Sequence, residues 1–181
     1  MADRFSTLRP DLAQWWREQP MFFVATAPSG GDGHVNLSPK GYDTLRVLAA
    51  DRVAYLDLTG SGVETIAHLR ENGRVTLMAC AFTGNPRISR IYGRGRVHAV
   101  GSPEFDDLAP QFPELPGARS IIDIAVERVT TSCGYAVPMM DLVDDRERLL
   151  DWATAKGADG VVEYRQKKNA VSIDGLPGID A

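Results

Sequence analysis

Residues 56–77 read LDLTGSGVETIAHLRENGRVTL. The pattern predicts the end of a strand, a loop with two glycines, a helix, a turn and a second strand. Ser61 and Glu64 match the capping box S-x-x-E, in which the serine hydroxyl and the glutamate carboxylate each accept a hydrogen bond from the other residue's amide. Asn72 and Gly73 predict the left-handed residue that ends such a helix. The stretch therefore predicts a helix that forms without a ligand.

The same loop also allows a second interpretation, an anion site. Thr59, Ser61, Thr65 and the free amides of the first helical turn are donors that suit a phosphate. Glu64 counts against a phosphate because its carboxylate competes for the positive end of the helix dipole. No lysine or arginine lies between residues 53 and 69 to add positive charge. Both interpretations stay open at the level of the sequence.

Upstream, residues 21–27 (MFFVATA) are strongly β-prone and residues 28–33 (PSGGDG) predict a turn. The next segment, HVNLSPKG, alternates polar and apolar residues, so the pattern predicts the second strand of a hairpin. Pro39 is expected to end the ladder of this strand. Lys40 then stands at the strand end near Ser38, where a lysine can reach a phosphate or an electron-rich ring, although many such lysines are only solvated.

Further along the chain, the pattern predicts four more strands, which cover residues 52–58, 74–82, 86–100 and 120–137. Leu8, Leu12, Trp15 and Trp16 recur at helical spacing, which predicts a short amphipathic N-terminal helix that docks its two tryptophans on an apolar surface. Further helices are predicted for a segment that begins after Ser102 and for one or two segments near the C-terminus with a stop at Gly157. Hairpins and long bent strands favour a mainly β (α+β) fold, a six-stranded antiparallel split β-barrel with peripheral helices. We expect one domain over residues 1–181, with an N-terminal helix in 1–19, the barrel in 20–138, and C-terminal helices and a tail in 139–181.

The strand over residues 86–100 is rich in arginine. Arg90 and Arg94 share a face with Arg96 around Tyr92, whereas Arg87 points the other way. Such a row of arginines can bind a phosphate, stack on an aromatic ligand or pair with acids across a subunit interface. A solvated or ion-paired face explains it equally well.

Composition narrows the function classes. The 181 residues carry a net charge of −4, which gives no general attraction to nucleic acid or to an anionic membrane. No apolar run approaches the roughly 20 residues of a membrane span and the N-terminus lacks the apolar core of a signal peptide, so we expect a cytoplasmic location. The three histidines show no metal-ligand spacing, and His68 is expected to be exposed beside charged helix residues. Cys80 and Cys133 form no C-x-x-C pair and are expected to be buried thiols.

The order of the hairpin with NLSPKG, the TGSGVETIAHLRENGRVTLMACA segment and the IYGRGRV strand resembles the pyridoxamine 5′-phosphate oxidase-like family of flavin-binding split barrels. The resemblance runs over roughly residues 20 to 100, and it implies a homodimer with two FMN sites at the subunit interface. Lys40 and Thr59 match family residues that contact the cofactor. Glu64 and Thr65 stand where the family has two basic residues on the phosphate, and Gly175 in the SIDGLP tail replaces a substrate-binding arginine.

What the resemblance implies is an FMN-dependent oxidoreductase that acts on an unidentified small molecule. Expected alternatives are a relative that uses a deazaflavin, or a non-catalytic split-barrel dimer that has lost its flavin site. The expected cofactor-binding residues are Ser38, Lys40, Thr59, Ser61 and Thr65, with Arg87, Arg90 and Arg94 as sources of the missing charge.

Overall fold

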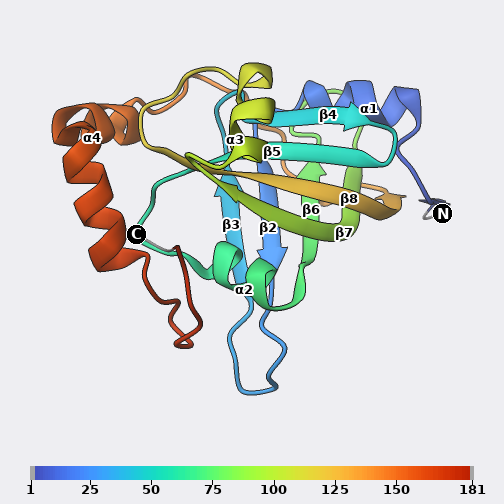
Figure 1. Ribbon diagram of the computed structural model, residues 1–181. Coiled ribbons are helices and arrows are strands. Elements are labelled where there is room, and N and C mark those ends of the chain that lie inside the picture. Colours follow the sequence, from blue (N-terminus) through green and yellow to red (C-terminus); the bar gives the residue numbers. More distant parts are fainter. Residues whose placement is uncertain (1–2, 180–181) are drawn as a thin grey trace.

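The structure is a computed structural model that describes residues 3–179, so the first two and last two residues of the predicted domain lie outside the described part. Within that part, eight strands form one sheet and four α-helices lie around it (Figure 1). The strands are β1 Asp3–Phe5, β2 Phe22–Thr26, β3 Asn36–Lys40, β4 Leu45–Ala49, β5 Arg52–Leu58, β6 Arg74–Cys80, β7 Ile88–Ala99 and β8 Ala118–Ser132. The helices are α1 Pro10–Arg17, α2 Glu64–Asn72, α3 Pro103–Leu108 and α4 Arg148–Lys168, with a 3-10 turn at Ala109–Gln111. No helix of residues 3–179 is long and apolar enough to cross a membrane.

The sheet is antiparallel throughout and its strands follow the order β3-β2-β6-β7-β8-β5-β4. The long strand β8 joins its parts, because its first half pairs with β5, its end pairs with β1, and β7 runs along nearly its whole length. The mainly β class with peripheral helices is confirmed, but the prediction of six strands was wrong. Closure into a split barrel stays a prediction, since β3 and β4 are the sheet's edges within residues 3–179.

The two missed strands lack the local signals that mark strands in a sequence. β4 turns into β5 through Ala50 and Asp51 without the glycine, proline or asparagine that usually marks such a hairpin. β1 has only three residues and is defined by its pairing with Val129–Thr131 of β8. β1 therefore depends on a partner far away in the chain, whereas β4 pairs with the neighbouring β5 through a turn that carries no such signal.

Some predicted boundaries also need correction. Pro39 does not end its strand but pairs with Phe23 inside β3, and an edge strand tolerates the missing amide of proline. The last strand ends at Ser132 rather than at Val137, just before Gly134 packs against the backbone of Arg87. Cys133 lies in this irregular part and is exposed, whereas Cys80 is buried as expected.

The helix α1 docks its apolar face on the sheet, as the spacing of its tryptophans predicted. Leu12 and Trp16 are buried there, and the Trp16 indole donates to the Ser89 hydroxyl at 3.0 Å. A larger core fills the inner face of the sheet around residues such as Val24, Leu77 and Ile91. This core fixes the strands whose ends carry the polar residues described below.

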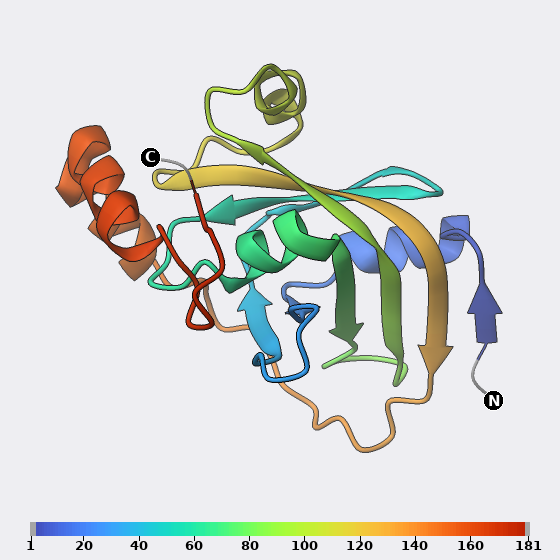
Figure 2. The same ribbon diagram turned by 60° about the horizontal axis from the view of Figure 1, so that its bottom comes forward.

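The C-terminal third extends along the side of the sheet. Residues 133–147, which we call the β8–α4 connection, run without regular structure to α4, which stands at the side of the molecule away from β1 (Figures 1 and 2). Gly157 has φ 69° and divides α4 into two limbs, which confirms the predicted stop. The tail then folds back toward the β2–β3 hairpin, where Asp174 accepts from the His34 amide at 2.8 Å.

Candidate functional site

Polar side chains gather where the inner face of β3 meets α2 and the end of β5; we call this place the seam. From β3, Asn36 donates through Nδ2 to Thr65 Oγ1 of α2 at 2.9 Å. Lys40, at the other end of β3, donates through Nζ to Asp57 Oδ1 of β5 at 2.8 Å. Ser38 lies between them and donates to Asn36 Oδ1 at 3.1 Å. Three of the predicted site residues, Ser38, Lys40 and Thr65, are therefore brought together.

A buried hydrogen-bond network extends from the seam into the core. Asn36 Nδ2 donates to Thr26 Oγ1 at 3.1 Å, and Thr26 Oγ1 lies 3.0 Å from Nδ1 of His68. A hydroxyl that accepts from Asn36 can still either donate to or accept from His68 Nδ1, so Thr26 links the ring to the seam in both neutral tautomers. The prediction of an exposed His68 was wrong, since the side chain is fully buried. Burial lowers the pKa of His68 despite the opposing charges of Asp174, Glu64 and Glu71, so the ring is neutral at pH 7.

A charged cluster lies beside this network. Asp57 is fully buried and accepts from Arg119 Nε at 2.6 Å as well as from Lys40. Burial alone would raise the pKa of Asp57, but the charges of Lys40 and Arg119 outweigh it and lower the pKa to about 2. The carboxylate is thus ionised at neutral pH, and it holds the Lys40 ammonium in place.

The loop between β5 and α2 is held by hydrogen bonds to residues that come later in the sequence. Thr59 is fully buried, donates to Gly117 O at 2.7 Å and accepts from Arg165 Nε of α4 at 2.9 Å. Asn169, also buried, accepts from Arg119 at 3.0 Å and donates to Gly60 O at 3.0 Å. In this chain the hydroxyl of Thr59 is therefore committed to internal hydrogen bonds.

The start of α2 differs from the predicted capping box. The helix begins at Glu64, Val63 occupies the N-cap position, and no side chain caps this end. Ser61 is exposed. The Glu64 carboxylate instead folds over Gly62, whose Cα carries no side chain to obstruct it, and its Oε1 accepts from the Ile173 amide of the tail at 3.4 Å. The capping box was therefore wrong, while the predicted stop at Gly73 is confirmed by its φ of 71°.

The arginines of the β7 region lie apart from the seam. Arg90 and Arg94 are on the outer face of the sheet, opposite to the face that carries Lys40, and Arg94 pairs with Glu127 at 3.2 Å. Arg87 precedes β7, and its guanidinium lies 5.6 Å from the ring centre of Trp15. Within this single chain, none of these three joins the seam.

Sequence reasoning missed four residues that build the site: Asp57, Arg119, Arg165 and Asn169. Asp57 gave one usable signal, because it is the single charge inside the otherwise apolar strand segment VAYLDL. A charge in such a run predicts a buried ion pair, although it does not say with which partner. Arg119, Arg165 and Asn169 lie 60 or more residues beyond Asp57 in sequence, and only the fold brings them to the β5–α2 loop.

Comparison with known proteins agrees with this architecture. A family model described as pyridoxamine 5′-phosphate oxidase matches residues 8–133. The pyridoxamine 5′-phosphate oxidase family protein ustO of Aspergillus flavus is 38% identical over 194 residues, which cover 97% of this chain and 77% of that protein. The chain therefore belongs to the pyridoxamine 5′-phosphate oxidase family, as the sequence resemblance implied.

Solved structures share the fold at low sequence identity. A protein of Lactobacillus delbrueckii, provisionally described as a pyridoxamine 5′-phosphate oxidase, superposes with a TM-score of 0.53 at 22% identity, over 69% of this chain and 94% of that one. An FAD binding protein from Mycobacterium smegmatis gives a TM-score of 0.51 at 14% identity, over 70% and 96% of the two chains.

Proposed function

We propose that this protein binds FMN at the seam and works, as a homodimer, as an FMN-dependent oxidoreductase on a small molecule. The observation that carries the proposal is the row of polar side chains on the inner face of β3, directed at α2 and β5 in a chain of this family. The Mycobacterium smegmatis protein is described as FAD binding, which supports a flavin as the class of cofactor.

The seam carries groups of the kind that interact with the ring system of a flavin. Ser38 offers a hydroxyl and Lys40 an ammonium, and hydrogen bonds or positive charge at the nitrogen and oxygen edge of the ring are what flavoproteins supply. Two buried side-chain atoms lack a partner in the described part of the chain, Tyr55 Oη and His68 Nε2. Lys40 Nζ lies 5.8 Å from the ring centre of Tyr55, and His68 belongs to the Asn36 network. Unused hydrogen-bonding capacity next to the seam is consistent with a polar ligand or water that completes it.

The phosphate end needs positive charge from somewhere other than the start of α2, because the Glu64 carboxylate lies over Gly62 there. The best candidates are Arg119 and Arg165, behind the β5–α2 loop. Arg165 has no carboxylate within 4.0 Å among residues 3–179 and is held by Thr59 and by two backbone carbonyls. Its cation is thus available to balance an anion at this loop.

In this proposal, a bound flavin supplies the hydride or electron transfer. Lys40 would stabilise negative charge at the edge of the ring, and Asp57 with Arg119 keeps the lysine side chain directed into the seam. The Asn36 network fixes the orientation of Ser38. These residues orient and stabilise; the chain offers no group that we assign as a general acid or base.

The outer face of the sheet supports the homodimer. Val35, just before β3, and Leu37 of β3 are 75% and 63% exposed there. In register with Leu37 lie Ala25, Thr76, Tyr92 and Arg128 of the neighbouring strands. An apolar edge next to an arginine-rich region is suited to a protein partner. A second copy on this face would bring Arg90 or Arg94 toward the other chain, where they can meet an anion.

A second candidate is favoured by Glu64. A carboxylate folded over the loop disfavours phosphate, so the chain would then be a non-catalytic dimer that keeps the fold without the cofactor.

The purified protein distinguishes these functions. If FMN binds, the protein is yellow or quenches added FMN fluorescence, and FMN raises its melting temperature. Lys40→Ala should then weaken FMN binding by about tenfold, which corresponds to about 1.4 kcal/mol. Lys167→Ala, which removes an exposed lysine of α4, is the matched control and should bind FMN like the parent protein. A colourless protein without quenching or thermal stabilisation would favour the non-catalytic dimer, and an unchanged affinity in Lys40→Ala would remove Lys40 from the site.

A further inference from the structure

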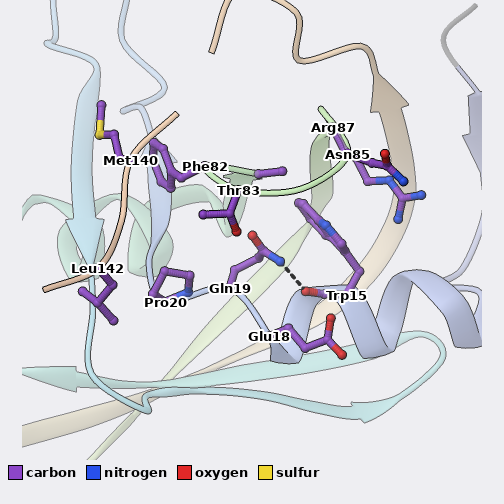
Figure 3. Close-up of a pocket in the computed structure, with 11 residues that line it drawn as sticks. Trp15, Glu18, Gln19, Pro20, Phe82, Thr83, Asn85, Arg87, Met140 and Leu142 are labelled. Atoms are coloured by element: carbon purple, nitrogen blue, oxygen red, sulfur yellow. Dashed lines mark hydrogen bonds between the residues drawn. The ribbon is translucent and has the colours of Figure 1, made fainter. Parts of the chain in front are cut away.

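A pocket of about 410 Å³ opens between α1, the β6–β7 turn and the β8–α4 connection, outside the seam. Figure 3 shows its side chains around a common space. Trp15 and Gln19 come from the end of α1, Phe82 and Arg87 from the β6–β7 turn, and Met140 from the β8–α4 connection. The volume is that of a small-molecule site.

The positive charge of this pocket belongs to Arg87. Its guanidinium stacks on Trp15, and no carboxylate of residues 3–179 lies within 4.0 Å of it. Ala81 donates its amide to Arg87 O at 2.8 Å, and Gly134 packs on the Arg87 backbone. The fold thus fixes the backbone of Arg87, and its guanidinium group is available to a planar anion such as a carboxylate.

The remaining walls combine apolar side chains with the polar side chains of Gln19, Thr83 and Asn85. Phe82, Met140, Leu142 and Pro20 line the pocket, and Met140 donates its amide to Phe82 O at 3.0 Å, which fixes the connection against the turn. The same four residues line an adjoining pocket of about 430 Å³ that reaches Lys40. Glu18 also lines the first pocket, where its carboxylate accepts from Gln14 Nε2 at 2.8 Å. A neutral amide does not cancel the charge of a carboxylate, so the anionic group of a ligand belongs on the Arg87 side of the pocket, away from Glu18.

We infer that this pocket binds a small organic carboxylate with an aromatic or branched apolar body. The carboxylate pairs with Arg87, and the body lies against Trp15, Phe82 and Met140. Trp15 and Arg87 together recognise a flat group with negative charge. The Phe82 ring and the Met140 thioether accept varied apolar shapes. The inference goes beyond the proposed function and does not require a bound flavin.

The test uses 4-fluorobenzoate as the probe and 4-fluorobenzamide as its neutral counterpart, with the full chain and without FMN. Fluorine NMR of each probe measures its dissociation constant. We expect the benzoate to bind at least tenfold more tightly than the benzamide, and Arg87→Gln to remove that preference. Arg96→Gln, an exposed arginine of β7 outside the pocket, should keep it.

Phe82→Ala should weaken both probes, because it removes a wall that they share, and circular dichroism melting verifies that each variant is folded. The inference is wrong if the benzoate does not bind at about 10 mM. It is equally wrong if both probes bind alike or if Arg87→Gln binds the benzoate like the parent protein. Since FMN is left out, these results are independent of the flavin titration.

Discussion

Asp57 shows how one residue organises the candidate site. Its carboxylate has no exposed surface and is met from two sides by Arg119 and Lys40. A buried charge without partners is costly, so the three side chains form one unit that is destabilised when any one of them is removed. The same unit fixes the ammonium that we propose to act on a flavin.

This unit predicts a pH dependence of stability. The pKa of Asp57 falls from its ordinary 3.8 to about 2 in the folded chain. A lowered carboxyl pKa contributes stability that is fully present above pH 3.8 and is lost as the pH falls through about 2. The difference corresponds to about 2 kcal/mol. Urea unfolding at several values between pH 5 and pH 2 should show this loss in the parent protein.

Two variants isolate the contribution of Asp57. Asp57→Asn lacks the titrating group, so its stability should change less over this pH range than that of the parent protein. If Asp57→Asn does not fold, Lys40→Met keeps the carboxylate beside Arg119 alone and should shift the loss to higher pH. Identical pH profiles for the parent protein and both variants would show that the cluster does not set the pKa of Asp57.

At the scale of elements, the long pair β7 and β8 depends on a close approach of backbones. A Cβ at Gly93 would lie 2.2 Å from Ala125 O and 2.9 Å from Ile124 Cγ2, at the place where the register between the two strands shifts. The register passes over Glu127, so the extra residue of this irregularity lies in β8, opposite Gly93 of β7. Side chains of β7 alternate between the core and the arginine-rich outer face on both sides of this point.

Gly93→Ala should therefore lower the free energy of unfolding by about 1–3 kcal/mol, because the nearest atom is the backbone oxygen of Ala125, which cannot easily give way. Gly30→Ala, in the β2–β3 turn with nothing within 4 Å of its added methyl group, is the control and should be nearly neutral. Chemical denaturation of both variants measures the difference. Equal midpoints would mean that the β7–β8 pair relaxes without cost.

For the whole molecule, the open outer face of the sheet predicts the oligomeric state. If a second copy covers Leu37, then Leu37→Asp should convert a dimer into a 19.7 kDa monomer because the charge would be buried at the interface. Light scattering after gel filtration measures the mass. Val143→Asp places the same charge on a 96% exposed residue of the β8–α4 connection and should leave the dimer intact. A parent protein that is already monomeric would refute this part of the proposal.

The sequence by itself determined most strands, the family, and the location of the helices. Those features follow from local patterns: the alternation in HVNLSPKG, the stop at Gly73 and Gly157, and the amphipathic spacing of Leu12 and Trp16. Such signals are carried by neighbouring residues, so they can be interpreted before any tertiary contact is known. They also identified Ser38, Lys40 and Thr65, which the fold brings to one place.

Only the tertiary structure decided how the site is charged. Arg119, Arg165 and Asn169 reach the β5–α2 loop from distant segments, and Glu64 turns toward the tail instead of toward Ser61. Burial of His68 likewise depends on segments packed around α2 rather than on its charged neighbours in sequence. Local pattern specifies which elements form, whereas the energy of a buried charge depends on partners that come together only in the folded chain.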